Sequence, residues 1–597
     1  MRARLKKFRE GLIPIQRTLT LVWASSRRLS ATLAGLTLLS ALVPLGIAYA
    51  GKGIVDAVVA HARDRTLRWV AVELGLIVLT ALLGRLLGLT RQLLGARLGL
   101  DINLQILRKA QTLSLRHFED PEFYDQLTRA RREASTRPLS VVSEAFQLVQ
   151  NVLTLAGYVA LLIRFSGWAV LGLVAAAVPA TLAEMRFSKQ AFRLRNWRSP
   201  ESRQLMYLEY VLANDDHAKE VKLFGLGPGL LTRYQTLGEA FYLEDTKLAL
   251  KRAGWAYGLS LLGTFAFYGA YGSMAVAAAM GALTLGLMTL YVMAFRQGQQ
   301  AFQSILSAVG GMYEDNLYMS NLFQFLAIPT DVVPVPPPLA TLPAATEQGV
   351  RFEDVGFQYP GRPEWALRHV NLFIPKGQSL ALVGQNGAGK TTFIKLLTRL
   401  YAPGEGRILL DGKDLNAWDE TALRRRVGVI FQDFNQYQLK VRENVGVGSV
   451  EHQEDSERVQ RAVDRGGATE VVAGLKSGLE TPLGRWFKDG VELSGGQWQK
   501  VALARAFMRE EADILILDEP TAALDAEAEH AIFERFRQLA AGRTTLLISH
   551  RFPTVRMADR IVVLEKGTVQ EEGSHAELLA LNARYAHLFA LQAQGYQ

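Results

Sequence analysis

Residues 384–392 read GQNGAGKTT and fit the pattern G-x-x-x-x-G-K-[ST]. The apolar run SLALV before them predicts a buried strand, and FIKLLTRL after them predicts a helix. This is the context of a phosphate-binding loop, because glycines let backbone N–H groups turn toward an anion and the helix N-terminus adds partial positive charge. In that role Lys390 reaches the β and γ phosphates of a nucleotide and Thr391 holds Mg²⁺. The predicted loop residues are Gly384, Gln385, Asn386, Gly387, Ala388, Gly389, Lys390, Thr391 and Thr392. Taken alone, the motif leaves an ordinary glycine-rich turn as the alternative.

A pair of acids follows a second apolar strand, ILILD at residues 514–518. Asp518 is placed to bind Mg²⁺ through water, and Glu519 to orient or deprotonate an attacking water. A lone pair of acids at a strand end is usually a surface charge. Downstream of a phosphate-binding loop, the pair favours hydrolysis of a nucleoside triphosphate.

A second glycine-rich element, LSGGQ at residues 493–497, precedes the helical stretch WQKVALARAF. Ser494, Gly495, Gly496 and Gln497 would stand at the start of that helix. Backbone N–H groups and the helix dipole predict a second anion site there. One chain would then carry two phosphate-binding elements about a hundred residues apart.

Taken together and in this order, GQNGAGKTT, LSGGQ and ILILDE resemble the ATP-binding-cassette (ABC) family, over residues 350–591. The resemblance implies that each ATP is held between the phosphate loop of one subunit and the LSGGQ element of another. Further roles that it implies are adenine stacking by Tyr359, contact of Gln432 with Mg²⁺ and the attacking water, a dimer-interface loop with Asp525, and a γ-phosphate contact by His550. Ala523 departs from the usual serine of that interface loop. Because every element for hydrolysis is present, a homodimer with two active sites is favoured, and an unequal partner remains the alternative.

The composition indicates a chain of several domains with a membrane part. The 597 residues are 49% hydrophobic and 21% charged, and cysteine is absent, which excludes disulfides, thiolate nucleophiles and cysteine-ligated metals. A net charge of +10 could indicate nucleic acid or the cytoplasmic flanks of membrane helices. The placement of the basic residues favours the membrane, and no nucleic-acid partner is expected.

Six apolar segments predict membrane spans at residues 29–50, 67–94, 141–163, 168–185, 255–280 and 283–306. The linkers 164–167 and 281–282 are short, whereas 91–138 and 186–252 are long and rich in charge. The positive-inside tendency makes the long loops cytoplasmic. The prediction is a multi-pass protein of the cytoplasmic membrane, with both termini and the ATPase in the cytoplasm.

Four regions are predicted from these patterns. Residues 1–28 are basic and form an interfacial segment, and residues 29–327 form an all-α transmembrane domain. Residues 328–348 are a proline-rich linker, because proline cannot hold a helix or a central strand. Residues 349–597 alternate short β-like runs with helices, which predicts a cytoplasmic α/β P-loop ATPase domain.

Six spans ahead of a fused ATPase resemble the exporter type of the family. HFEDPEFYDQL (117–127) and LANDDHAKEVKLFG (212–225) are predicted turns between helices, each with a short helix. By resemblance they fall where coupling helices dock on the ATPases, the second on that of the partner subunit. The lead-in LGRWFKDGVELSGGQ is similar to exporters of ribosomally made peptides such as lantibiotics. No leader-cleaving peptidase is expected, since few residues precede the first span and there is no cysteine.

The predicted function is ATP-driven export by alternating access, of a peptide or an amphipathic small molecule. A lipid or lipid-linked glycan flippase is the alternative, whereas an importer or a gated channel is less favoured. Polar side chains within spans usually face a cavity or a partner. A cargo cavity suited to polar, amphipathic or partly anionic molecules is hypothesised along Arg85, Arg296, Gln299, Gln300 and Gln303, with interhelical bonding as the alternative, above all for Arg85.

Overall fold

The computed structural model describes residues 16–120, 123, 126–128, 130–131, 137–165, 167–197, 199–330, 348–519, 542–549 and 551–594. The chain divides into two compact units. The first comprises Met1–Thr112 and Pro121–Pro329, and the second Leu113–Asp120 and Thr330–Gln597.

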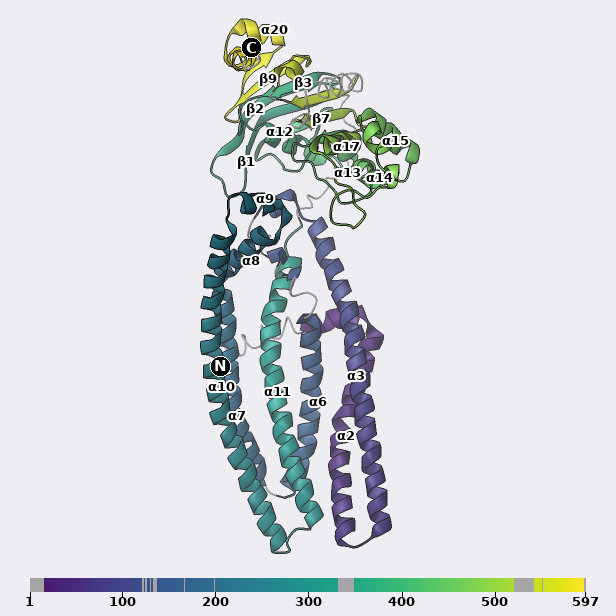
Figure 1. The fold of residues 1–597 in the computed structure, drawn as a ribbon, viewed down its shortest axis with the longest axis vertical. Helices are drawn as coiled ribbons and strands as arrows, with labels where there is room; N and C mark the ends of the chain where they lie inside the picture. Colours follow the sequence, from purple (N-terminus) through teal and green to yellow (C-terminus); the bar gives the residue numbers. More distant parts are fainter. Residues whose placement is uncertain are drawn as a thin grey trace. The chain divides into compact units, whose positions relative to one another are not determined.

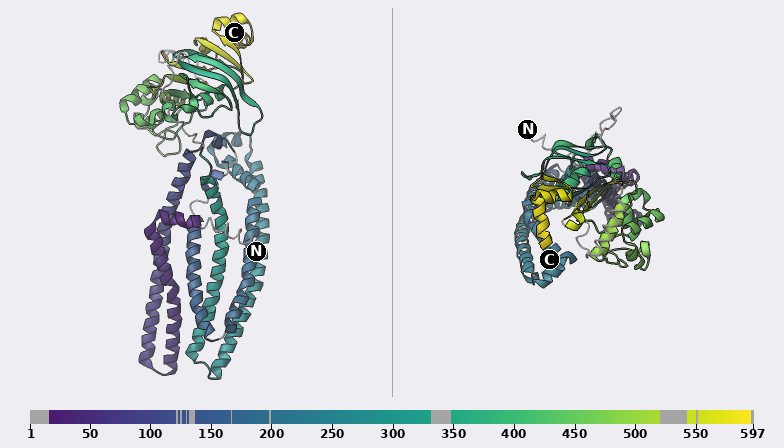
Figure 2. Two further views of the ribbon diagram at one scale, coloured as in Figure 1. Left: turned by 180° about the vertical axis from the view of Figure 1, so that it is seen from behind. Right: turned by 90° about the horizontal axis from the view of Figure 1, so that it is seen from above.

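The first unit is helical. Residues 16–25 form a helix within the predicted interfacial segment, whose place at a membrane interface stays a prediction. The following helices are α2 (Arg27–Val59), α3 (Arg63–Gln111), α6 (Arg137–Ile163), α7 (Gly167–Trp197), α8 (Ser199–Ala213), α9 (Asp215–Leu223), α10 (Gly227–Ala279) and α11 (Leu285–Leu326) (Figure 1). The long helices run beside one another in pairs, α2 with α3, α6 with α11 and α7 with α10 (Figure 2).

Each predicted membrane span lies within one long helix of this unit, apart from a residue or two at the ends of the last two. Helices α2, α3 and α10, and α6 from Pro138, are long and apolar enough to cross a membrane. Helices α7 and α11 have 31 and 42 residues, more than the about 20 that a crossing needs. The predicted helices are therefore confirmed, and the number of crossings stays a prediction.

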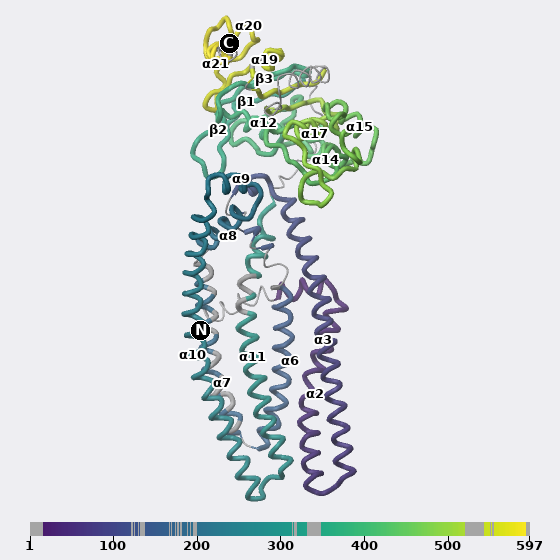
Figure 3. The backbone as a smooth tube through the Cα atoms, in the orientation of Figure 1, coloured from purple at the N-terminus to yellow at the C-terminus, as the bar shows by residue number. Residues whose placement is uncertain are grey.

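Several helices continue well beyond their apolar segments. Helix α10 has 53 residues and α3 has 49, and the tube trace follows both without a break (Figure 3). The two predicted short helices are also present. Helix α4 (Leu115–Phe118) begins two residues before the first predicted turn, and α9 occupies the second.

The described residues of the second unit form two sheets. One is antiparallel with the order β2-β1-β4-β5, formed by β1 (Gly349–Gln358), β2 (Trp365–Pro375), β4 (Glu405–Leu410) and β5 (Lys413–Asp414). The other has the order β10-β9-β3-β8-β7-β6, formed by β3 (Ser379–Val383), β6 (Val427–Ile430), β7 (Ile514–Asp518), β8 (Thr544–Ile548), β9 (Arg560–Glu565) and β10 (Thr568–Gly573). Its strands pair in parallel except β10, which is antiparallel to β9.

The helices of this unit cover the sheets and form a small helical layer. Besides α4, which belongs to this unit, its described helices are α12 (Lys390–Leu397), α13 (Glu420–Arg425), α14 (Val441–Gly446), α15 (Ser456–Arg465), α16 (Thr469–Ala473), α17 (Gly495–Phe507), α19 (Phe552–Val555), α20 (His575–Leu581) and α21 (Arg584–Gln594), with short 3₁₀ turns at Leu415–Ala417, Val447–His452 and Gly478–Glu480. Trp498 of α17 is 1% exposed and lies in the core that α14, α15 and α16 share with it.

Gly466, which caps α15, lies directly against the backbone of α17. A Cβ atom there would lie 2.5 Å from the backbone nitrogen of Ala504 and 2.6 Å from its Cα. Only glycine therefore allows α15 and α17 to approach this closely.

We expect Gly466→Ala to destabilise this unit by about 1–3 kcal/mol, because backbone atoms must move to admit the methyl group. Gly474→Ala is the matched control. Gly474 also caps a short helix with φ of −75°, and its added Cβ would come no closer than 3.4 Å to any atom. Chemical denaturation monitored by tryptophan fluorescence measures both, and equal stability of the two variants would contradict the packing argument.

Candidate active site

The phosphate loop has the backbone that its glycines predict. Gly387 and Gly389 have φ of +81° and +104°, in the left-handed region, and Gly389 caps α12. A Cβ at Gly384 would lie 2.3 Å from the carbonyl oxygen of Leu564, and one at Gly389 would lie 2.6 Å from that of Ala366. These positions admit only glycine, because the loop turns back against the ends of neighbouring strands.

Lys390 follows the loop and is only 7% exposed. Its Nζ donates hydrogen bonds to the carbonyl oxygens of Gly384, at 2.7 Å, and Gln385, at 3.1 Å. Burial lowers the pKa of Lys390, while the nearby carboxylates of Glu519 and Asp518 act in the opposite direction. The ammonium is thus held at the mouth of the loop, where phosphate oxygens would replace the two carbonyls.

Asp518 lies at the end of β7, 2% exposed, as predicted for a carboxylate that ends a buried strand. The hydroxyl of Thr391 donates to its Oδ2 at 3.3 Å. Burial, and then the charge of Glu519, raise the pKa of Asp518 to about 6. A hydroxyl and one carboxylate are donors that suit Mg²⁺, which prefers oxygen ligands and takes its remaining ones from water and phosphate. These residues fit the predicted metal.

Glu519 has φ of +50°, an uncommon conformation for a residue with a side chain. Its backbone N–H donates to the carbonyl oxygen of Ile548 at 3.0 Å, and the Gln432 amide donates to its Oε2 at 2.9 Å. The sequence predicted both residues, but not the strained backbone. Strain of this kind persists where the surrounding structure fixes it, commonly at functional sites.

Lys390, Thr391, Gln432 and Glu519 border one cavity of about 490 Å³, whereas Asp518 lies outside its lining. The predicted residues that line it are Tyr359, Asn386, Gly387, Gly389, Lys390, Thr391, Thr392, Gln432 and Glu519. The Tyr359 hydroxyl is 3.1 Å from Oγ1 of Thr392, which fixes the ring at the cavity edge. Among the described residues, sequence reasoning missed four further lining residues, Arg362, Glu364, Trp365 and Ala366. Their only signal is their closeness in sequence to Tyr359.

The LSGGQ element stands at a helix start, as predicted, and lies away from the cavity. Ser494 caps α17, accepting from the Gln497 N–H at 3.3 Å while its own N–H donates to Oε1 of Gln497 at 2.9 Å. Gly495 and Gly496 begin the helix. None of these four is among the described residues that line the cavity. Asp525 and His550 lie outside the described residues, so their predicted roles stay predictions.

A phosphate loop, a buried strand-end aspartate and a following glutamate define a P-loop ATPase, here in one chain with a unit of long apolar helices. The family model described as ABC transporter matches residues 367–522. Subtilin transport ATP-binding protein SpaT of Bacillus subtilis is 30% identical, over 94% of this chain and 91% of that protein. An ATP-dependent lipid A-core flippase of Thiobacillus denitrificans is also 30% identical, over 95% and 96%. The solved structure of a bacterial Atm1-family ABC exporter with ATP bound superposes with a TM-score of 0.76 at 25% identity, over 95% and 98%.

The chain belongs to the ABC transporter family, as its motifs predicted. The comparisons also confirm the fold class, a helical domain of ABC exporter type followed by an ABC ATPase domain. It is therefore a membrane transporter that binds and hydrolyses ATP to drive export.

We expect Glu519→Gln to lower the ATPase rate by a factor of about 10²–10⁴, the usual contribution of a positioned general base. ATP binding should persist, since the amide keeps the shape of the side chain. Glu565→Gln is the matched control, an acid at the end of β9 in the same sheet, outside the residues that line the cavity. Steady-state hydrolysis and equilibrium nucleotide binding check both, and a Glu519→Gln protein that hydrolyses ATP normally would remove the assignment.

Proposed function

We propose that the chain is a half-transporter that works as a dimer with two composite ATP sites. The observation that carries this proposal is the separation within one chain of two anion-binding elements. Lys390 and Thr391 line the cavity, whereas Ser494 and its neighbours do not. A second copy would supply the missing LSGGQ element to each cavity.

Within each site, the chain's own groups divide the work. Lys390 and the loop N–H groups bind the phosphates, and Tyr359 stacks on the adenine. Thr391, Asp518 and Gln432 would hold Mg²⁺, which when bound neutralises phosphate charge. Glu519, held by Gln432 at 2.9 Å, accepts a proton from the attacking water. His550 is assigned to the γ-phosphate and Asp525 to the interface between copies.

A mixed dimer tests the composite sites. Lys390→Ala and Ser494→Arg should each abolish turnover in a homodimer, because each removes one element from both sites. In a dimer of one copy of each, one site carries both defects and the other carries none. We expect that dimer, purified through two different affinity tags, to regain ATP hydrolysis. A mixed dimer as inactive as its parents would contradict the proposal.

The membrane arrangement is proposed from charge and exposure. The Arg-rich loops after α3 and around α9 favour a cytoplasmic location, which puts the ATPase (residues 349–597) and both termini on that side of the cytoplasmic membrane. Residues 29–327 would then form the membrane domain and 328–348 the linker. Leu223 and Phe224, at the end of α9, are 78% and 66% exposed. An apolar pair so exposed on a charged segment supports docking on the ATPase of the second copy.

The cargo cavity is proposed along one face of α11. Arg296, Gln300 and Gln303 are exposed and recur at helical spacing. Gln299 does not share that face fully, since it is half-buried and its amide lies against Gly263 of α10, where a Cβ would come within 2.5 Å of it. Arg85 is exposed on α3. The cavity assignment is therefore kept for Arg296, Gln300 and Gln303, and Gln299 is assigned to packing.

The proposed cargo is a peptide or an amphipathic small molecule with an anionic group. An arginine among amide side chains suits such a molecule, because the guanidinium pairs with carboxylate or phosphate. The subtilin transport protein favours a peptide, and it aligns over nearly the whole chain. The lipid A-core flippase aligns equally well, which keeps a lipid as the second candidate.

We expect Arg296→Leu with Gln300→Leu to weaken cargo stimulation of ATPase about tenfold or more, since a hydrogen bond to a charged group is worth about 1.5–3 kcal/mol. Basal ATPase should remain. Arg296→Lys with Gln300→Asn is the control, because it keeps charge and polarity. Proteoliposomes titrated with amphipathic peptides, and separately prepared with lipid A, distinguish the two cargo classes. Unchanged stimulation in the leucine variant would remove the cavity assignment.

A further inference from the structure

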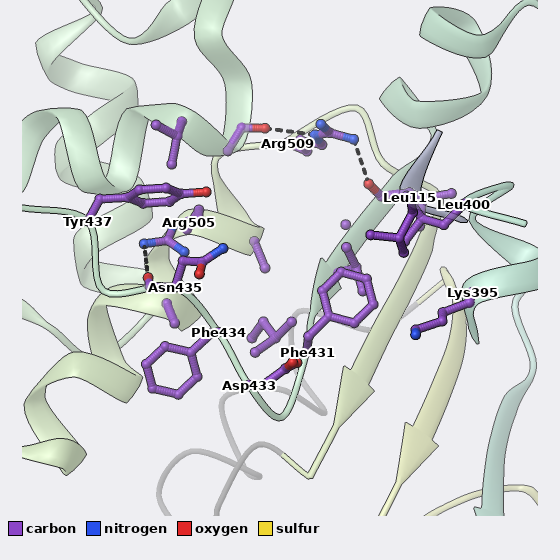
Figure 4. Close-up of a pocket in the computed structure, with 18 of the residues that line it drawn as sticks. Leu115, Lys395, Leu400, Phe431, Asp433, Phe434, Asn435, Tyr437, Arg505 and Arg509 are labelled. Carbon is purple, nitrogen blue, oxygen red and sulfur yellow. Dashed lines mark hydrogen bonds between the residues drawn. The ribbon is translucent and has the colours of Figure 1, made fainter. Parts of the chain in front are cut away.

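Residues Leu113–Asp120, which follow α3, belong by their contacts to the ATPase unit. Leu115 of α4 packs against the core of that unit. Figure 4 shows Leu115 beside Leu400 at one side of a second cavity, with Lys395 close by. At the end of α4, the Glu119 carboxylate accepts from Nζ of Lys395 at 2.8 Å and from the Tyr401 hydroxyl at 2.5 Å. A segment that leaves a membrane helix is thus held by two donors of the ATPase.

The same two donors support the ring of Tyr359. Nζ of Lys395 lies 5.4 Å from the centroid of that ring. The Tyr401 ring meets it edge to face, with centroids 5.6 Å apart and planes at 80°. Phe357 meets it in the same way at 5.0 Å. Of these three groups, two are held by Glu119.

The charges of this cluster are stable at neutral pH. Burial raises the pKa of Glu119, but hydrogen bonds from Lys395 and Tyr401 outweigh it, and the net shift is downward. Burial lowers the pKa of Lys395, yet the hydrogen bond to Glu119 makes its net shift upward. Burial and the bond to Glu119 also raise the pKa of Tyr401. Glu119 and Lys395 therefore remain an ion pair, and Tyr401 keeps the proton that it donates.

An ordinary surface ion pair would hold this segment only weakly, since such pairs contribute about 0–1 kcal/mol to stability. This one differs in its surroundings. The Glu119 side chain is 39% exposed, but its partners are less so, Lys395 at 20% and Tyr401 at 8%, and packing holds both of them. Lys395 also lies on α12, the helix that begins at the phosphate loop.

We propose that Glu119 is a positioning residue for nucleotide binding, which sets the Tyr359 ring against the base through Lys395 and Tyr401. The inference rests on the proposed ATP site, in which Tyr359 stacks on adenine. The segment after α3 then responds to the base end of the nucleotide as well as to its phosphates. Because coupling between two sites is reciprocal, displacement of this segment weakens ATP binding by the same factor by which ATP binding holds the segment in place.

The test is equilibrium binding of ATP to the full-length protein in a Glu519→Gln background, where turnover is blocked. We expect Glu119→Gln to weaken ATP binding about three- to tenfold, the size of one aromatic or cation–π contact. Tyr401→Phe, which keeps the ring and removes only the hydroxyl, should act in the same direction. Glu480→Gln is the matched control. Glu480 also accepts from two cationic side chains, Lys440 at 2.9 Å and Arg442 at 2.6 Å, but it lies outside the residues that line the ATP cavity.

Two further measurements separate positioning from a general structural role. Inorganic tripolyphosphate, which has no base, should bind Glu119→Gln as tightly as the parent. In a Tyr359→Ala background, Glu119→Gln should have no further effect on ATP. Equal weakening of ATP and tripolyphosphate, or full additivity with Tyr359→Ala, would overturn the inference and leave the ATP site intact. If Tyr359→Ala alone left ATP binding unchanged, the proposed base contact itself would be wrong.

Discussion

The nucleotide site of the ATPase unit depends on the attraction between one buried ammonium group and two neighbouring carboxylates. Lys390 and Asp518 are 7% and 2% exposed, and Glu519 adds a second negative charge beside them. Buried charges are costly unless they are paired and hydrogen-bonded. The loop carbonyls accept from Lys390, Thr391 donates to Asp518, and Gln432 donates to Glu519. Parallel strands make this convergence possible, because β3 and β7 bring their carboxyl ends to one edge of the sheet.

The short helix α12 connects both ends of the nucleotide site. Within two turns it carries Thr391, beside the carboxylate, Thr392, bonded to the Tyr359 hydroxyl, and Lys395, paired with Glu119. A helix this short moves as one body, so its phosphate and base contacts cannot change independently. The packing of Phe393 on Phe352, with ring centroids 4.1 Å apart, fixes the helix against β1. Nucleotide occupancy and the segment around Glu119 therefore share one rigid support.

The sequence alone was sufficient to assign site residues that belong to a local motif. Gly384 and Gly389 could be assigned because only glycine satisfies the turn and the close approach that the loop requires, and Asp518 because it ends an apolar strand. It was insufficient where packing decides. No periodicity in the sequence indicates the positive φ of Glu519, which is a matter of backbone strain. The same is true of the lining position of Trp365 and the contacts of Glu119, which arise between segments far apart in the sequence. Gln299 shows the same limit, since helical spacing could not tell an exposed face from a contact with Gly263.

The long, unbroken helices of the first unit bear on the transport mechanism. Hydropathy marks only the apolar portion of a helix, whereas α10 continues through charged residues. It has 53 residues in total, which corresponds to a length of about 80 Å at about 1.5 Å per residue. Proline occurs in it only at its first turn, where the missing N–H breaks no helical bond. Shortening such a helix would break backbone hydrogen bonds, and in lipid each unsatisfied group costs several kcal/mol. We therefore expect a displacement of α9, immediately before α10, to tilt or rotate the whole helix together with α7, which runs beside it. In the proposed mechanism, alternating access would arise as these helix pairs change their packing, as in hinge and shear motions of other proteins.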